Sequence, residues 1–260
     1  MTTPLDLGVH AVEVRERAAQ ALDTRIITVM AGKGGIGKSL FAKELAWLLD
    51  LVLVDLDWDG GCATRSMGYL HEKYTNAPLL DALESGRTPR PRRMTHRPDL
   101  IPSHPDFEAN QPEADEMSTT LVRWSKELDR TLMCDTHPGG SPSTLGACAA
   151  ADLVIMPVVL GTQELNAVEQ SLAEMSGYPL LLVPNWVPAI PPAAERKRLR
   201  DIASRYDVRV SRAFVSEYRW MRTRKLRTAI TAAPTFSKRT EPVATDFVAL
   251  AEEVLSYAAG

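Results

Sequence analysis

Gly32-Lys33-Gly34-Gly35-Ile36-Gly37-Lys38-Ser39 lies between an apolar stretch, residues 26–31, and a segment with a helical pattern. The spacing G-x-x-x-x-G-K-S is typical of a loop whose backbone N–H groups surround a polyphosphate at the N-terminus of a helix. Lys38 is predicted to contact the β- and γ-phosphates, and the Ser39 hydroxyl to bind Mg²⁺. The predicted nucleotide-binding residues are Gly32, Lys33, Gly34, Gly35, Ile36, Gly37, Lys38, Ser39 and Leu40.

The same residues also fit a dinucleotide fingerprint. Gly32, Gly34 and Gly37 spell G-x-G-x-x-G, and Asp57 follows Gly37 by 20 residues, which is the spacing of NAD-binding and FAD-binding folds. A pyrophosphate-binding turn does not need the Lys38-Ser39 pair, so the triphosphate interpretation is favoured. A glycine turn without a ligand is the weaker third alternative.

Length and composition fit one large domain. The chain has 260 residues, 45% of them apolar, which is enough for one large core. We predict an N-terminal helical appendage at 1–24, with a weak apolar face of Val9, Val12 and Ala19, and an ATPase domain at 25–260. The three cysteines lack the spacing of a zinc site or a disulfide framework, and no secretory signal or membrane span is visible. A soluble, cytoplasmic protein is expected.

Apolar runs alternate with helical patterns along the chain. Because the runs are continuously apolar, they suit strands that are covered on both faces. The fold class predicted is α/β, with a mostly parallel twisted sheet flanked by helices on both faces. The predicted strands are residues 26–31, 51–55, 100–103, 131–135, 153–159, 180–184 and 208–215. Residues 86–112 are rich in Pro and Arg and are expected to form a surface excursion.

Three acids follow these strands. Asp55 and Asp57 end one apolar run, and Asp135 ends another. Because ligands of open parallel sheets sit outside the carboxyl ends of the strands, these acids are expected near the phosphate loop. One of them can orient an attacking water and others can support the metal ion. Helix capping is the competing role for each acid taken alone.

The chain resembles the ParA/MinD group of deviant Walker A ATPases, and its ParA-like partition branch most closely. The resemblance covers most of the chain from residue 25 onward and rests on Lys33 within the loop, on Val54-Asp55-Leu56-Asp57 and on Asp135-Thr136-His137-Pro138-Gly139. The chain is also similar to that family over residues 154–166 and in the closing segment, residues 232–254. In that family, a lysine at the position of Lys33 crosses the interface of a nucleotide-sandwich dimer.

This resemblance implies an ATP-dependent homodimer that hydrolyses ATP with Mg²⁺ and segregates a plasmid, a chromosome or another cargo with a ParB-like adaptor protein. It implies catalytic roles for Lys33, Lys38 and Asp57. Ser39, Asp55 and Asp135 are expected to support the metal ion. A cation contributed across the dimer would stabilise the transition state as an arginine finger does.

The sequence departs from the family pattern at three places. Leu40 replaces a second hydroxyl residue, Trp58-Asp59-Gly60 replaces a Pro-Gln pair after the second acid, and His137 replaces a proline. A local packing or hydrogen-bonding role is favoured for His137, because phosphoryl transfer depends more on positioning and charge stabilisation than on a strong base. The departures bear on the hydrolysis rate and leave nucleotide binding as predicted.

Charge is distributed unevenly. The net charge is −3, but residues 196–239 hold 14 Lys or Arg against three acids, so this segment carries +11 and the remainder −14. A basic region on an acidic body suggests a polyanionic partner, and ParA-like ATPases bind DNA without sequence preference through basic residues in the C-terminal half. The residues expected to contact non-specific DNA, in the ATP state and on the nucleoid, are Arg196, Lys197, Arg200, Arg219, Arg222, Arg224, Lys225 and Arg227. A solvated charged face is the alternative.

A MinD-like membrane cycle is a competing function. It requires a C-terminal amphipathic helix with a basic polar face. The last helical segment instead carries Asp246, Glu252 and Glu253. No membrane partner is therefore expected. An iron–sulfur reductase of the wider group would need suitably spaced cysteines, which the chain lacks.

Overall fold

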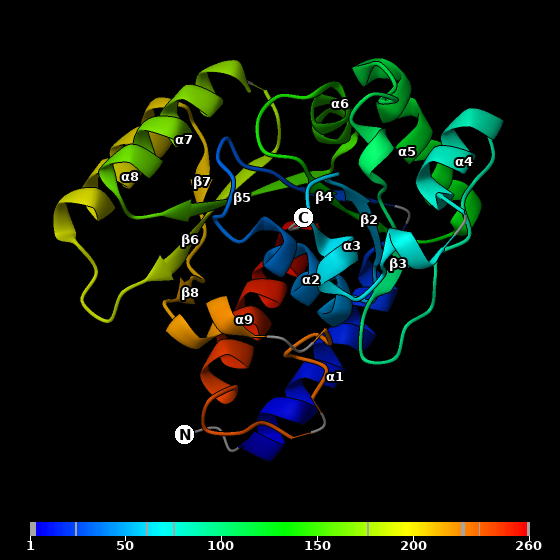
Figure 1. Ribbon diagram of the computed structural model, residues 1–260. Helices are drawn as coiled ribbons and strands as arrows, with labels where there is room; N and C mark the ends of the chain where they lie inside the picture. Colours follow the sequence, from blue (N-terminus) through cyan, green and yellow to red (C-terminus); the bar gives the residue numbers. More distant parts are fainter. Residues whose placement is uncertain are drawn as a thin grey trace.

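A parallel β-sheet runs through the middle of the molecule (Figure 1). The computed structural model describes residues 4–23, 25–60, 62–74, 76–175, 177–224, 227–233 and 235–258. The strands are β1 (Ile26–Val29), β2 (Val52–Leu56), β3 (Asp99–Ile101), β4 (Leu132–Thr136), β5 (Leu153–Val159), β6 (Leu180–Val187), β7 (Arg209–Val210) and β8 (Val215–Ser216). Their order is β3-β2-β4-β1-β5-β6-β7, and β8 pairs with the far end of β6.

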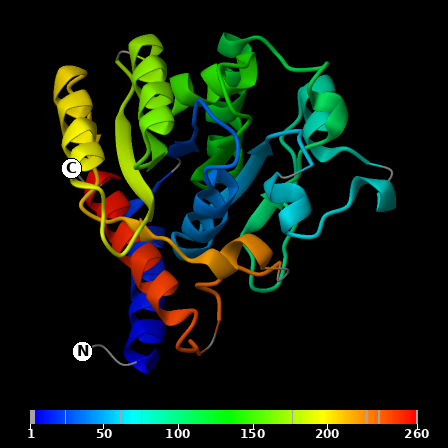
Figure 2. The ribbon, with the colours of Figure 1, turned by 60° about the vertical axis from the view of Figure 1, so that its left-hand side comes forward.

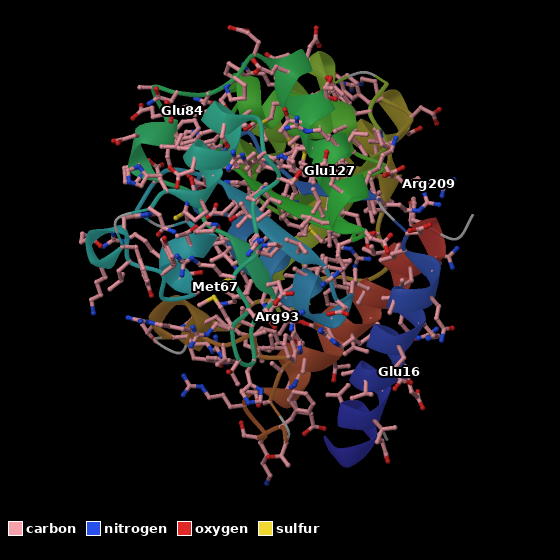
Figure 3. The ribbon with its side chains drawn as sticks, turned by 90° about the vertical axis from the view of Figure 1, so that its right-hand side faces the viewer. Glu16, Met67, Glu84, Arg93, Glu127 and Arg209 are labelled. Atoms are coloured by element: carbon pink, nitrogen blue, oxygen red, sulfur yellow. The ribbon has the colours of Figure 1, made fainter. Side chains whose placement is uncertain are left out.

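Helices cover both faces of this sheet. One face carries α1 (Pro4–Ala21), α2 (Lys38–Leu48) and α9 (Glu241–Ala258), and the other carries α4 (Pro78–Ser85), α5 (Ala114–Leu128), α6 (Pro142–Ala150), α7 (Thr162–Glu174) and α8 (Ala193–Arg205). Figure 3 shows the separation of these layers, with Glu16 of α1 and Glu84 of α4 at opposite ends of the molecule. Short elements complete the fold: α3 (Ala63–Ser66), η1 (His71–Lys73), η2 (Pro105–Phe107) and η3 (Arg219–Thr223).

The predicted fold class is confirmed, and the reason lies in the strand sequences. Every residue of β1, β2 and β4 is buried. Successive side chains of a strand point to opposite faces, so a continuously apolar strand packs against both helical layers. Alternate residues accordingly enter different cores: Ile27 and Val29 contact the α1, α2 and α9 layer, whereas Ile26 contacts the layer of α4 to α6.

One predicted strand differs from the structure. The apolar run 208–215 does not form one strand but two short ones, β7 and β8, which both pair with β6. The intervening chain turns at residues 211–214, where Ser211 donates to the carbonyl of Ala213 at 2.8 Å. Both short strands therefore lie along β6, separated by this turn.

The predicted apolar face of the N-terminal helix was wrong. Val9, Val12 and Ala19 are exposed on α1, with Val9 and Val12 each 55% exposed. The buried face is formed instead by Leu7, Ala11, Val14, Ala18 and Leu22. These residues recur at helical spacing and belong to the same core as α2 and α9, so α1 packs against the sheet layer. The division at residue 24 remains a prediction.

The topology brings the chemical residues to one edge. Because β1, β2 and β4 are parallel neighbours, their carboxyl ends lie side by side. The phosphate loop leaves β1 there and leads into α2, which begins at Lys38. Figure 2 shows η3 and the chain after it lying near the same region, beside the connection that precedes β3. A backbone hydrogen bond of 3.0 Å from Ala229 to the carbonyl of His96 joins these two segments.

Candidate functional site

The loop from Gly32 to Gly37 has the backbone that its glycines predict. Gly35 and Gly37 adopt positive φ angles of 75° and 96°, a region that side chains disfavour. Asn185, fully buried at the end of β6, donates its Nδ2 group to the Ile36 carbonyl at 2.7 Å. A Cβ atom on Gly37 would lie 2.9 Å from that Nδ2 atom. Asn185 therefore fixes the loop immediately before α2.

An open cavity of about 610 Å³ lies beside this loop. Gly34, Gly35, Gly37, Lys38 and Ser39 form one wall, as predicted for a phosphate site. Lys38 is only 5% exposed, so its ammonium group is held at the cavity and largely shielded from bulk water. The remaining wall consists of Leu40, Lys43, Asp57, Asp59, Arg65, Ser66, Pro138, Trp186, Met221, Arg224, Arg227 and Ile230.

Two buried acids lie behind the phosphate loop. Asp55 and Asp135 are register partners on β2 and β4, and both are fully buried. Asp55 accepts hydrogen bonds from the backbone N–H of Thr64 at 2.6 Å and of Asp57 at 3.1 Å. Burial raises the pKa of Asp55 to about 6, against these hydrogen bonds, which lower it. Asp55 is thus held by the backbone of α3, so its carboxylate is less free than that of Asp135.

Asp135 has the environment of a cation ligand. Neither of its carboxylate oxygens makes a well-aligned hydrogen bond among the described residues, although both are buried and the Ser39 side chain is near enough to lower the pKa of Asp135. Burial and the neighbouring Asp55 carboxylate raise the pKa of Asp135 well above its usual range, while Ser39 and Lys38 lower it. A buried, unpartnered carboxylate beside a serine hydroxyl has the hard oxygen donors that Mg²⁺ prefers. Ser39 and Asp135 therefore fit a magnesium ion, and Asp55 stands behind them.

Asp57 reaches the cavity wall. It is 6% exposed, and its Oδ1 atom accepts a hydrogen bond of 3.0 Å from the backbone N–H of Asp59. Burial raises the pKa of Asp57, while the hydrogen bond from Asp59 and the charges of Lys38 and His137 lower it. One hydrogen bond leaves the carboxylate of Asp57 with further acceptor sites for a water in the cavity.

Lys33 lies away from this cavity. Its Nζ atom is 3.8 Å from Oε1 of Glu164 on α7, and its side chain is 43% exposed. The residue lines a separate small hollow with Met156 and Val159 of β5. Within one chain, Lys33 therefore does not join Lys38 at the phosphate wall.

The structure adds cavity residues that the sequence analysis missed. Lys43 is 6% exposed on α2, and burial lowers its pKa. Arg224, Met221 and Ile230 close the cavity from the C-terminal segment. Asn185 could have been found, because it is a polar residue at the carboxyl end of a strongly apolar strand. The C-terminal wall carries no spacing signal, since residues so distant in sequence are joined only by tertiary packing.

The predicted DNA-contacting residues do not form one surface. Arg196, Lys197 and Arg200 are exposed on α8, which packs on the sheet face opposite to α2. Arg219 is exposed on η3, whose Trp220 and Met221 pack on the α2 face. Arg224 and Arg227 line the cavity beside the phosphate loop, and the Arg227 side chain lies against Gly68. Lys225 and the Arg222 side chain lie outside the described part of the chain.

Comparison with solved structures supports the same fold. A ParA family ATPase from Chlorobium tepidum TLS superposes with a TM-score of 0.66 at 18% identity, covering 88% of this chain and 98% of that one. A McdA variant from Cyanothece in complex with ATP gives 0.66 at 15% identity, over 87% and 96% of the two chains. A cobyrinic acid a,c-diamide synthase from Mycobacterium smegmatis, with bound ADP and magnesium, gives 0.63 at 25% identity, over 80% and 90%.

These likenesses establish the fold expected from the sequence. No family model matches the chain, and no curated protein sequence matches it. The strand order also separates the fold from the dinucleotide-binding alternative, because β4 lies between β1 and β2, whereas the two are neighbours in the order 3-2-1-4-5-6. Over the residues that the structure describes, no helix is both long enough and apolar enough to span a bilayer.

Proposed function

We propose that this chain is a Mg²⁺-dependent ATPase of the ParA/MinD type, whose nucleotide cycle positions a cargo in the cell. One observation carries the proposal: a buried, unpartnered Asp135 carboxylate lies beside Ser39, at a cavity where the phosphate loop presents Lys38. Structures of similar fold contain ATP in one case and ADP with magnesium in another. Together these features favour a nucleoside triphosphate over a dinucleotide.

Each residue of the site has a separate role in the proposed phosphoryl transfer. Lys38 neutralises charge on the β- and γ-phosphates, and the loop N–H groups donate to their oxygens. Asp57 accepts a hydrogen bond from the attacking water, which orients it toward the γ-phosphorus, and takes up its proton as the bond to phosphorus forms. Ser39 and Asp135 are the residues that would hold a magnesium ion, which would supply charge neutralisation for the phosphates. Asp55 keeps Asp57 in place through the hydrogen bond from the Asp57 backbone.

Lys33 acts across a dimer. It lies outside its own cavity and is partly exposed beside Glu164, so it can leave that surface ion pair to approach the triphosphate of a facing subunit. A second cation at the triphosphate offsets the repulsion that two bound nucleotides would otherwise create. ATP thereby links two copies of the chain, and hydrolysis releases them, with a ParB-like adaptor as the expected stimulator.

Non-specific DNA is the proposed ligand of the ATP-bound dimer. Arg196, Lys197 and Arg200 give α8 an exposed cationic face opposite its buried Leu199 and Ile202. Phosphate contacts from such a face need no base recognition and weaken with salt. The membrane alternative is less well supported, because Phe247, Leu250 and Val254 of the C-terminal helix are fully buried and are not available to lipid.

Asp57→Asn tests the catalytic assignment. The substitution keeps the shape of the side chain but removes its basicity, so ATP hydrolysis is expected to fall on the order of 10²-fold or more. The affinity for ATP should change by less than about threefold, because the hydrogen bond from Asp59 can be kept. Steady-state phosphate release and nucleotide titration measure the two effects. Asp106→Asn, at an exposed carboxylate, is the matched control, and wild-type turnover by Asp57→Asn would disprove the assignment.

A further inference from the structure

Residues that depart from the family pattern meet at one place. Trp58 and Asp59 follow β2, and His137 follows β4. The imidazole of His137 is stacked on the indole of Trp58, with ring centroids 4.0 Å apart and planes within 5°. Trp58 in turn contacts the buried ring of Phe107 edge-on at 6.1 Å. The proposed ATPase mechanism uses neither Trp58 nor His137.

The stacking aims the imidazole at two carboxylates. Nε2 of His137 is 3.3 Å from Oδ2 of Asp59. One ligand atom each from Asp57, Asp59 and His137 lie within 4.8 Å of one another. The three groups differ in exposure: Asp57 is 6% exposed, whereas the side chains of His137 and Asp59 are 23% and 63% exposed. This cluster of three residues is therefore buried on the side of Asp57 and open to solvent on the side of Asp59.

We propose that Asp57, Asp59 and His137 form a site for a divalent transition metal such as Zn²⁺, separate from the proposed magnesium position at Ser39 and Asp135. An imidazole nitrogen with two carboxylate oxygens is a donor set that zinc and its neighbours take, with water in the open positions. Ligand atoms around zinc lie about 2.0 to 2.2 Å from the ion. The side chain of Asp59, which is 63% exposed, is the ligand with most room to adjust around an ion.

The donor set distinguishes this position from the magnesium position. Mg²⁺ takes oxygen ligands and keeps several waters, so an imidazole adds little to its binding. Ser39 and Asp135 offer oxygen only. Among the described residues, no cysteine belongs to this cluster, and Cys62, Cys134 and Cys148 are buried free thiols.

Occupation of the site has a consequence that rests on the proposed function. Asp57 would be bound to the metal and unable to accept a proton from water. Zn²⁺ would then inhibit hydrolysis while leaving the phosphate loop free to bind nucleotide. The metal site itself does not depend on ATPase activity, so it is tested on the nucleotide-free protein.

Zinc titration calorimetry in excess Mg²⁺ tests the site. The wild-type chain is expected to bind one Zn²⁺. His137→Asn and Asp59→Asn should each weaken binding at least about tenfold, because loss of groups that only orient ligands already costs 10- to 100-fold. Because Asp59 is exposed, the Asp59→Asn variant is expected to fold normally. Circular dichroism verifies the folding of both variants.

The matched control is His104→Asn. His104 also lies near a carboxylate, with Nδ1 3.5 Å from Oδ2 of Asp106, so a surface histidine–aspartate pair that bound zinc by itself would be revealed there. Unchanged binding by His104→Asn, with loss in the other two variants, supports the site. Absence of zinc binding by the wild type, or equal affinity in folded His137→Asn, would show that His137 and Asp59 form only an ion pair, and would overturn the proposal whether or not the chain hydrolyses ATP.

Discussion

At the scale of single residues, the site depends on charges that the fold buries. Lys38 and Asp57 are each about nineteen-twentieths buried, and Asp55 and Asp135 are fully buried. Charged groups removed from water interact strongly with one another and with a ligand. Their arrangement around the phosphate loop is therefore where single substitutions should have the largest effects.

Lys38→Ala should remove most of the affinity for ATP. Truncating one partner of a buried, hydrogen-bonded charge pair costs about 2 to 5 kcal/mol, which corresponds to a loss of roughly 30-fold or more in affinity. Titration with a fluorescent ATP analogue measures the change. Lys73→Ala, at an exposed lysine outside the cavity, is the control and should bind normally. Wild-type affinity in Lys38→Ala would refute the assignment of the phosphate loop.

Magnesium-dependent ATP binding should weaken as the pH falls from about 7 to 5. Burial raises the pKa of Asp55 to about 6. Burial and the neighbouring Asp55 carboxylate raise the pKa of Asp135 well above its usual range, whereas Mg²⁺ requires ionised carboxylates. In the metal-free protein the sign is the reverse: carboxyl groups with raised folded pKa values stabilise the fold at low pH, and this contribution is lost as the pH rises through them.

The comparison of ATP titrations with Mg²⁺ and with a chelator, each at several pH values, isolates this effect. Only the magnesium-dependent part should fall with acidification. A magnesium contribution that stays constant between pH 7 and pH 5 would mean that Asp55 and Asp135 do not support the ion.

The site was predictable in part, for physical reasons that differ between residues. Gly37, Lys38 and Asp135 carry their information in local spacing, because a loop or a strand end places them. Two contacts depend on how separate loops pack at one edge of the sheet. They are the hydrogen bond from Thr64 to Asp55 and the stacking of His137 on Trp58. Spacing along the chain does not encode such contacts.

At the scale of elements, the sheet was foreseen better than the helices. The strands could be located as continuous apolar runs, because strands that are buried on both faces have few polar residues. On α1 the amphipathic pattern is weak, and the exposed Val9 and Val12 misled the choice of face. Residues 208–215 fold into two short strands, and the apolar pattern is itself broken at Ser211 and Arg212, where the chain turns.

The contact between Glu44 of α2 and residues 230–231 is expected to contribute strongly to the stability of the cavity wall. Glu44 of α2 is fully buried and accepts hydrogen bonds from the backbone N–H groups of Ile230 and Thr231 at 2.8 Å and 3.0 Å, and from the Thr231 hydroxyl at 2.9 Å. Glu44→Ala leaves these donors unpaired. The free energy of unfolding is expected to fall by roughly 2 to 4 kcal/mol.

Chemical denaturation of the two proteins measures this change. Glu84→Ala, at an exposed position on α4, serves as the control and should lie within about 0.5 kcal/mol of the wild type. If Glu44→Ala matched that control, the carboxylate would not be what fixes residues 230–231 to α2.

At the scale of the whole molecule, the basic residues are split between the two faces. The cationic side of α8 and the η3 region belong to opposite layers of the sheet. A single DNA duplex that contacts one chain through α8 therefore need not contact its η3. The split makes the contribution of α8 separable by mutation.

The triple variant Arg196→Ala, Lys197→Ala, Arg200→Ala should weaken DNA binding by the ATP-bound protein. Each lost phosphate contact lowers the slope of log affinity against log salt by about 1, so the slope should fall in magnitude by up to about 3. Retention on random-sequence duplex over a range of salt concentrations gives the slope. Arg87→Ala with Arg90→Ala, at exposed sites before β3, is the control. An unchanged slope in the triple variant would remove α8 from the DNA-binding surface.

ATP is proposed to join two copies of the chain through Lys33. Sedimentation analysis with a non-hydrolysable ATP analogue and Mg²⁺ tests it most directly. A particle of twice the 28.6 kDa chain mass is predicted with the analogue, a single chain without it, and a single chain for Lys33→Ala even when the analogue is bound. A wild-type protein that stays monomeric when saturated with the analogue would contradict the account.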